Sequence, residues 1–219
     1  MNITLLCSDD RHPVNAWLVG WADRNAHQHQ VSLVRRKQDL LGGDLLFLVS
    51  CSEVIGAAER ARYKATLVLH ASDLPRGRGW SPHIWEILAG ADHITLTLLE
   101  AADKVDSGRV WRKQRISIPK HALWDEINAR LFEAEIALID AAVRDFASIE
   151  PVEQDPGIEA NYYRRRTPAD SRIDPHESIE AQFDLIRVCD PVRYPAYFDL
   201  HGHRYRITLE KFDGPPDPD

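Results

Sequence analysis

The chain has 219 residues, a length that accommodates one domain with its own core and a small appendage. Its net charge of −7 argues against a general nucleic-acid or anionic-membrane surface, so an anionic ligand requires a local basic cluster. The three cysteines form no Cys-x-x-Cys pair, which argues against a structural zinc site and indicates reduced thiols. No apolar run reaches the length of a membrane span, and the first residues do not resemble a signal peptide, so we expect a cytoplasmic protein.

Apolar runs typical of strands recur through the first part of the chain. Strands are predicted over residues 2–8, 30–36, 44–52, 65–72, 93–100 and 109–118. Several of these runs are apolar without alternation, as in strands that are covered on both faces of a sheet. Helical segments separate them, so the pattern predicts an α/β fold with a mostly parallel sheet.

Two early helices are predicted between these strands. The first covers 16–25, with Ala16, Val19 and Ala22 on one side. The second covers 81–90, with Ser81 as its N-cap.

A long helix and a polar extension follow. The helix is predicted over 120–149 because six apolar positions share one stripe, namely Leu123, Ile127, Leu131, Ala134, Leu138 and Ala142. Composition changes at Pro151 to turn residues and charge, which divides the chain into a core, 1–150, and an extension, 151–219. The extension contains a short helix over 178–188 and two strands joined at His201-Gly202.

His70 stands at the end of a predicted buried strand, where ligands of open parallel sheets bind. The loop after it contains Pro75, Gly77 and Gly79, which fix the backbone or permit its close approach to a ligand. A second strand-end loop carries Asp106, so the two loops can bring a histidine and a carboxylate together. Such a pair can manage the proton of an amine nucleophile.

These residues carry a resemblance to a known family. The stretch "HASDLPRGRGWSPHIW", followed by "LLEAADKVDSG", resembles the core signature of the folate-dependent formyltransferases, in its residue types and in the spacing from His70 to Asp106. The resemblance covers about residues 1 to 120 and implies a Rossmann-like core. It also implies that His70 stabilises and protonates the tetrahedral intermediate, and that Asp106 holds His70 and helps to remove the amine proton.

The chain departs from the family pattern at Val68, where the family has an asparagine two residues before the histidine. That asparagine donates a hydrogen bond to the developing oxyanion, and one such donor is worth about 3 to 4 kcal/mol. Three explanations remain open. Protonated His70 and a backbone N–H suffice, Ser72 or Ser52 replaces the asparagine, or the chain has lost catalysis.

The resemblance implies 10-formyltetrahydrofolate as the bound cofactor. Its pteridine is expected between two loops that read the ring edge by backbone hydrogen bonds. The residues of these loops are Ser52, Glu53 and Val54 on one side and Ala102, Asp103, Lys104 and Val105 on the other.

The extension resembles the sugar-nucleotide branch of the family, the nearest likeness being to formyltransferases of nonulosonic-acid (pseudaminic-type) pathways. The resemblance rests on "YYRRRTPADSRID" and "LIRVCDPVRYPAYF". Three arginines beside aromatic residues in an acidic chain suit a diphosphate and a stacked base. The residues expected at the acceptor are Ser8, Asp9, Arg78, Trp80, Tyr163, Arg164, Arg165 and Arg166. Asp9 is alternatively a helix cap, and Trp85 is expected in the core.

The sequence thus predicts formyl transfer from the folate to the amine of a nucleotide-linked amino sugar. The alternatives are a formyltransferase that acts on another amine, in the purine pathway, on methionyl-tRNA or on a carrier-bound aminoacyl group, or a folate-binding protein without catalysis. The tRNA enzymes are expected to carry a larger C-terminal domain. No metal site, nucleic acid or membrane is expected as a partner. The apolar residues of the hairpin predict a homodimer, and the alternative is that the hairpin packs on the long helix of its own chain.

Overall fold

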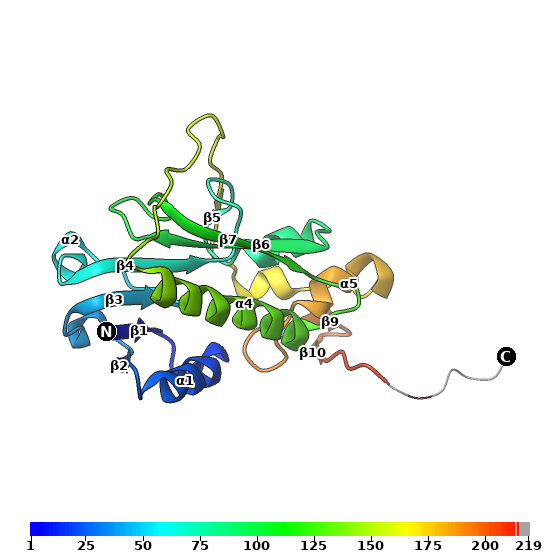
Figure 1. The fold of residues 1–219 in the computed structure, drawn as a ribbon. Helices are drawn as coiled ribbons and strands as arrows, with labels where there is room; N and C mark the ends of the chain where they lie inside the picture. The colour runs from blue at the N-terminus through cyan, green and yellow to red at the C-terminus, as the bar shows by residue number, and fades with distance from the viewer. Residues whose placement is uncertain (213, 215–219) are drawn as a thin grey trace.

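A computed structural model of the chain describes residues 1–212 and Gly214 (Figure 1). A six-stranded sheet lies at its centre, in the order β2-β1-β3-β4-β6-β7. Its strands are β1 Asn2–Leu6, β2 Gln30–Val34, β3 Gly43–Leu48, β4 Tyr63–His70, β6 His93–Glu100 and β7 Val110–Ser117. The first four strands run parallel, whereas β6 is antiparallel to β4 and β7 is antiparallel to β6. The predicted α/β fold with a mostly parallel sheet is therefore confirmed.

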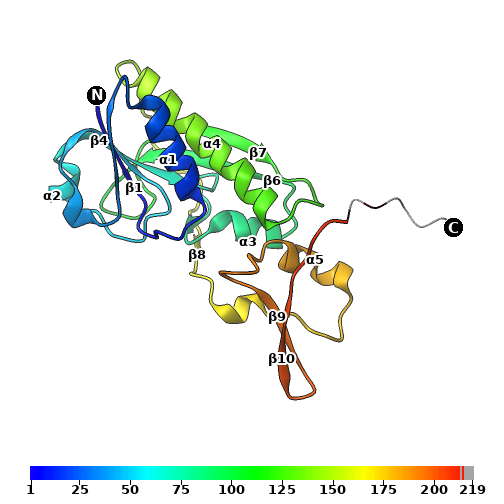
Figure 2. The ribbon, with the colours of Figure 1, turned by 90° about the horizontal axis from the view of Figure 1, so that it is seen from below.

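Helices α1 (Val14–Asn25) and α4 (Trp124–Asp145) pack side by side over one face of the sheet (Figure 2). All six apolar positions of the predicted long stripe are buried, five of them on α4 and the sixth, Leu123, at the residue before it. The helix predicted over 16–25 is confirmed, but its buried face is not the one marked by Ala16, Val19 and Ala22, because α1 buries Val14, Leu18 and Trp21. These larger side chains follow the i, i+4, i+7 spacing and remove more apolar area from water than three small residues would.

The opposite face carries a smaller apolar cluster under the loops that follow β2 and β3. Helix α2 (Ala57–Arg60) and the 3₁₀ turn η1 (Lys37–Asp39) lie in these loops. Because side chains alternate along a strand, Val68 and His70 share this face, away from α1 and α4. At the end of β4, this face is therefore covered by loops and not by the long helices.

Helix α3 (Pro82–Leu88) begins after Ser81, as predicted, but Ser81 does not cap it with its side chain. Its backbone is left-handed, with φ of 47°, so the hydroxyl makes no hydrogen bond to the first turn.

The extension contains β8 (Tyr162–Tyr163), which pairs with β5 (Arg78–Gly79) of the core. It also contains the turn η2 (Pro168–Ser171), helix α5 (Ile179–Arg187) and the hairpin of β9 (Ala196–Leu200) and β10 (His203–Ile207). The hairpin turns at His201 and Gly202, as predicted, and both have positive φ. Figure 2 shows the hairpin projecting away from the central sheet. The Pro- and Asp-rich composition of 213–219 predicts a disordered tail, and apart from Gly214 this stretch lies outside the described residues.

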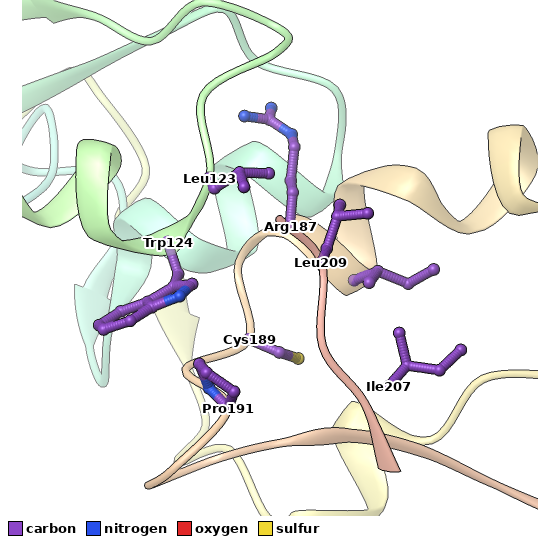
Figure 3. Close-up of a pocket in the computed structure, with 8 residues that line it drawn as sticks. Leu123, Trp124, Arg187, Cys189, Pro191, Ile207 and Leu209 are labelled. Atoms are coloured by element: carbon purple, nitrogen blue, oxygen red, sulfur yellow. The ribbon is translucent and has the colours of Figure 1, made fainter. Parts of the chain in front are cut away.

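The division of the chain at residue 150 stays a prediction, since the segment after it contacts the core at once. Val152 forms a β-bridge with Val110. Further on, the fully buried Arg187 ties α5 to the core by donating to the carbonyl oxygens of Pro119 (3.3 Å) and Ala122 (3.0 Å). Figure 3 shows this junction, where a cavity of about 10 Å³ has room for about one water molecule and not for a substrate.

None of the helices in the described part of the chain combines the length and the apolar composition needed to cross a membrane.

Candidate functional site

The structure brings His70 and Asp106 together in a buried pair. Nδ1 of His70 lies 3.6 Å from Oδ1 of Asp106, and the two side chains are only 8% and 7% exposed. The distance suits an ion pair and is too long for a direct hydrogen bond. The other ring nitrogen, Nε2, donates to the carbonyl oxygen of Gly77 at 2.8 Å.

The sequence analysis expected the loops after β4 and β6 to meet because both follow strand ends at one edge of the sheet, but the structure brings them together differently. Because β6 is antiparallel to β4, its carboxyl end lies beside the middle of β4, with Glu100 opposite Leu67. The loop after β6 then returns along β4 until Asp106, in a left-handed conformation with φ of 54°, reaches His70. The backbone N–H of Gly79 donates to Oδ2 of Asp106 at 2.9 Å and holds the carboxylate in place.

Two further histidines near this pair were not singled out in the sequence. Burial, together with the smaller effect of positive charge at His70, His12 and Arg166, lowers the pKa of His83 to about 3. Burial likewise lowers the pKa of His12 to about 4, and its Nδ1 accepts from the N–H of Val14 at the start of α1. Both rings are therefore neutral at physiological pH. The only signal for His83 was its position in the quoted stretch after His70.

Ser8 and Ser52 lie together at the ends of β1 and β3. Their hydroxyl oxygens are 3.0 Å apart, and the N–H of Ser52 donates to Oγ of Ser8 at 2.8 Å. Asp9 does not cap α1, since its carboxylate accepts from the N–H of Arg11 and pairs with Arg193. Burial raises the pKa of Asp9, but these two partners outweigh it and leave the pKa lowered.

Arg60 connects the two loops expected at the folate. Its guanidinium donates to the carbonyl oxygen of Ile55 at 2.8 Å and pairs with the carboxylate of Asp103. Val54 on one loop and Val105 on the other are 75% and 57% exposed, so each loop presents an apolar side chain to solvent. Glu53, in contrast, turns toward the backbone N–H of Lys37. The sequence analysis missed Arg60, which lies in an unremarkable short helix.

Aromatic rings and arginines alternate where β8 and α3 meet. The guanidinium of Arg165 lies 4.9 Å from the ring centre of Trp80, and that of Arg164 lies 4.9 Å from the ring centre of Trp85. Trp85 stacks on Tyr163 with ring centres 6.1 Å apart. Trp85 therefore belongs to this cluster and not to the core. We call Trp80, Trp85, Tyr163, Arg164 and Arg165 the cation–aromatic cluster.

The other two arginines expected at the acceptor have internal partners. Arg166 donates to the carbonyl oxygen of Asp170 at 3.0 Å. Arg78 is 8% exposed and donates to Oε1 of Gln154 (2.7 Å) and to the hydroxyl of Tyr162 (3.2 Å). Lys104, expected at the folate, lies over the same Tyr162 ring. Arg164 also pairs with the carboxylate of Asp170, so Arg165 has the fewest such contacts.

Val68 occupies the position of the family asparagine and packs against the smaller apolar cluster. Of the two serines considered as substitutes, Ser72 is fully buried and its hydroxyl has no partner among the described residues. Ser52 is exposed. Ser52 is thus the accessible hydroxyl of the two. No group of three His, Cys, Asp or Glu side chains within the described residues is arranged to hold a metal.

Solved structures with this fold include several formyltransferases. Methionyl-tRNA formyltransferase from Clostridium thermocellum is 21% identical, with a TM-score of 0.79, and the match covers 93% of this chain and 90% of that chain. A sugar N-formyltransferase from a Shewanella species is 15% identical, with a TM-score of 0.70, covering 95% and 97%. HypX from Aquifex aeolicus in complex with tetrahydrofolic acid is 19% identical, with a TM-score of 0.75, covering 92% of this chain and 36% of that chain. At these identities the likeness establishes the fold alone.

A family model described as "Formyl transferase" matches residues 5–143, which include the His70–Asp106 pair and both loops around Arg60. Because this match spans well over half of the chain, the protein belongs to the formyl transferase family, as an N-formyltransferase whose formyl donor is 10-formyltetrahydrofolate.

Proposed function

We propose that this protein transfers the formyl group to the amine of a nucleotide-linked amino sugar. The observation that supports this choice is the continuity between the buried pair and the cation–aromatic cluster. Gly79 donates to Asp106, and the next residue, Trp80, carries Arg165 on its ring. A ligand on the cluster therefore lies within a short reach of the catalytic pair.

His70 and Asp106 are the proposed catalytic residues. Nε2 of His70 exchanges its bond to the carbonyl oxygen of Gly77 for one to the oxygen on which negative charge develops. A proton on Nδ1 then faces the Asp106 carboxylate, which stabilises the charged ring. Asp106 also receives the proton that the amine releases, directly or through water, and this proton passes to the folate nitrogen as its bond to the formyl carbon breaks. Bound 10-formyltetrahydrofolate supplies the electrophilic formyl carbon.

The two loops joined by Arg60 fit a folate ring. Within the described residues, the backbone N–H groups of Glu53 and Val54 on one loop, and of Ala102 and Asp103 on the other, make no hydrogen bond. Free backbone groups on two facing loops suit the polar edge of a fused heterocycle, and exposed Val54 and Val105 suit its faces. We therefore keep the folate assignments of both loops.

The cation–aromatic cluster fits a nucleotide diphosphate. Trp80 is 42% exposed and offers a face to a base, while Arg165 offers a charge to a phosphate. A match covering 90% of the Clostridium methionyl-tRNA formyltransferase shows that chain length does not separate the two acceptor classes. The net charge of −7 still disfavours a tRNA surface.

Formyl transfer is tested with 10-formyltetrahydrofolate and a panel of UDP-, dTDP-, GDP- and CMP-linked amino sugars, with methionyl-tRNA as the competing acceptor. We expect transfer to at least one amino sugar and none to the tRNA. Transfer to the tRNA alone would overturn the acceptor that we propose.

The catalytic assignment is tested with His70→Ala, which is expected to lower kcat by about 10²- to 10⁴-fold, the usual span of a general acid–base group. Folate binding, followed by fluorescence, should change little. His93→Ala is the matched control, because His93 also pairs with an aspartate, Asp92, but at an exposed position. Near-normal kcat for His70→Ala would remove His70 from the mechanism.

A further inference from the structure

The loop that carries Asp106 is held by a segment that the sequence analysis left without a role. This segment, 152–161, follows α4 and contacts both catalytic loops. Its start is fixed on β7 by two hydrogen bonds between the backbones of Val110 and Val152 (2.7 and 2.9 Å). Near its end, Oδ1 of Asn161 accepts from the N–H of Gly77 (2.7 Å), whose carbonyl oxygen is the partner of His70.

In this segment, both the nitrogen and the oxygen of the Gln154 side-chain amide make hydrogen bonds to residues around the site. Its Nε2 donates to the carbonyl oxygens of Asp106 (2.9 Å) and Gly108 (3.0 Å), one on each side of Ser107. Its Oε1 accepts from Arg78 at 2.7 Å. Two donors and one acceptor are the groups that an amide provides, so a carboxylate or a hydrocarbon of the same size cannot make this set of contacts.

The backbone of the loop around Asp106 is in a constrained conformation, which the contacts of Gln154 help to maintain. A Cβ atom on Gly108 would lie 1.9 Å from the carbonyl oxygen of Glu100, so the backbone returns very closely to the end of β6. Asp106 itself is in the left-handed region, which is unfavourable for a residue with a side chain. A loop in such a conformation persists when its surroundings fix it.

We infer that Gln154 is a positioning residue, which clamps the Asp106 loop onto Arg78 so that the carboxylate faces Nδ1 of His70. The inference rests on the proposed function of that pair. Among the described residues, the hydrogen bonds of Gln154 go to Arg78 and to the loop backbone, and none goes to the His70 ring or the Asp106 carboxylate. Its effect on the reaction passes through the position of one carboxylate, and a displacement of about 1 Å can cost a factor of about 10² in rate.

The test makes the same substitution, glutamine to glutamate, at two positions. Gln154→Glu keeps an oxygen for Arg78 but sets an oxygen against both loop carbonyls. Gln182→Glu is the matched control, since Gln182 also uses its amide on backbone groups, those of Asp174 (2.6 and 2.9 Å), in the extension. We expect Gln154→Glu to lower kcat by about 10- to 100-fold, with both KM values within about twofold, whereas Gln182→Glu leaves kcat unchanged.

Hydrogen exchange gives a readout that is independent of the acceptor. The N–H of Gly79 is bonded to the Asp106 carboxylate, so its exchange rate reports where that carboxylate lies. We expect this one amide to exchange at least about tenfold faster in Gln154→Glu, at an unchanged melting temperature, and not in Gln182→Glu. Unchanged Gly79 exchange, or normal kcat in Gln154→Glu, would overturn the clamp. A wild type without transfer to any acceptor would overturn the proposed function, and the exchange measurement would still decide on the clamp.

Discussion

At the scale of single residues, Val68 marks the departure from the family pattern. Its side chain packs on the smaller apolar cluster, in register with Leu48 and Leu99 of the neighbouring strands. An asparagine at this position would bring an amide among apolar side chains. We therefore propose the accessible hydroxyl of Ser52 and the ring of His70 as the donors for the developing charge.

Val68→Asn is therefore expected not to raise kcat, and to lower the stability by about 1–3 kcal/mol if the amide finds no partner. Steady-state kinetics and thermal unfolding check this. Val34→Asn is the control, since Val34 packs on the same cluster from β2. A large gain in kcat for Val68→Asn would mean that the oxyanion lacks a donor in the wild type.

Glu135 is a buried carboxyl on α4 that the reaction does not use. Burial raises its pKa to about 8, and its Oε2 has no partner within the described residues. In the folded state Glu135 is therefore protonated up to about pH 8, whereas in the unfolded chain it ionises near its ordinary value of 4.5. The unfolded state binds fewer protons in this window, so stability falls as the pH rises from about 4.5 to about 8.

Glu135→Gln removes this titration and keeps the size of the side chain. We expect the difference in melting temperature between the variant and the wild type to shift in favour of the variant between pH 5 and pH 8, by about 2–4 °C per kcal/mol in a domain of this size. Comparing differences cancels the other titrating groups, including Glu86, whose pKa burial raises to about 7. A difference that does not change with pH would show that Glu135 is ionised in the folded protein.

At the scale of elements, β8 and the residues after it decide how the three consecutive arginines are used. Arg164 pairs with the Asp170 carboxylate, and Arg166 donates to the carbonyl oxygen of Asp170. The hydrogen bond from Arg164 and the N–H of Thr167 lower the pKa of Asp170 well below its usual range. Both arginines therefore fold the segment, and Arg165 on Trp80 is the one with a charge to offer a ligand.

Arg165→Ala is accordingly expected to raise the KM for the sugar nucleotide by about tenfold, which corresponds to one charge-assisted contact of about 1.4 kcal/mol. The KM for the folate and the melting temperature should stay unchanged. Arg164→Ala serves as the comparison and is expected to lower the melting temperature as well. If Arg165→Ala changed the two KM values equally, Arg165 would be an exposed residue that does not bind the sugar nucleotide.

At the scale of the whole molecule, the hairpin of β9 and β10 is covered on one side by its own chain. Ala196, Phe198 and Ile207 pack on the small cluster around Ile173 and Ile186 of the extension. The hairpin therefore packs on other residues of the extension, whereas the sequence analysis considered packing on the long helix as the alternative to a dimer. On β9 the outer edge is partly occupied, because Ile173 donates to the carbonyl oxygen of Tyr197. The strand β10 is mostly exposed and ends the two-stranded sheet.

We keep the prediction of a homodimer and place its contact at β10, about a two-fold axis. Light scattering at micromolar concentration is expected to give twice the chain mass of 25.0 kDa. Tyr205→Glu, on β10, should yield the monomer, whereas Tyr194→Glu, at a similarly exposed tyrosine outside the hairpin, should not. A wild type that runs as a monomer would reject the dimer.

The sequence by itself determined the order of elements and the two catalytic candidates. Apolar runs and the 3.6-residue stripe specify strands and α4 locally, and His70 and Asp106 lie in motifs whose residue types and spacing are visible in one dimension. The hairpin was predictable for the same reason, because its turn is made by adjacent residues.

Only the tertiary structure decided the direction of β6, the partners of each arginine and the role of Gln154. Strand direction depends on which neighbour satisfies the backbone, and an antiparallel β6 changes how Asp106 arrives at His70. Gln154 lies 48 residues from Asp106 in a polar stretch with no period or motif, so nothing in one sequence marks its contacts. Hydrogen bonds between distant segments are set by the packing of the whole chain, which local patterns do not record.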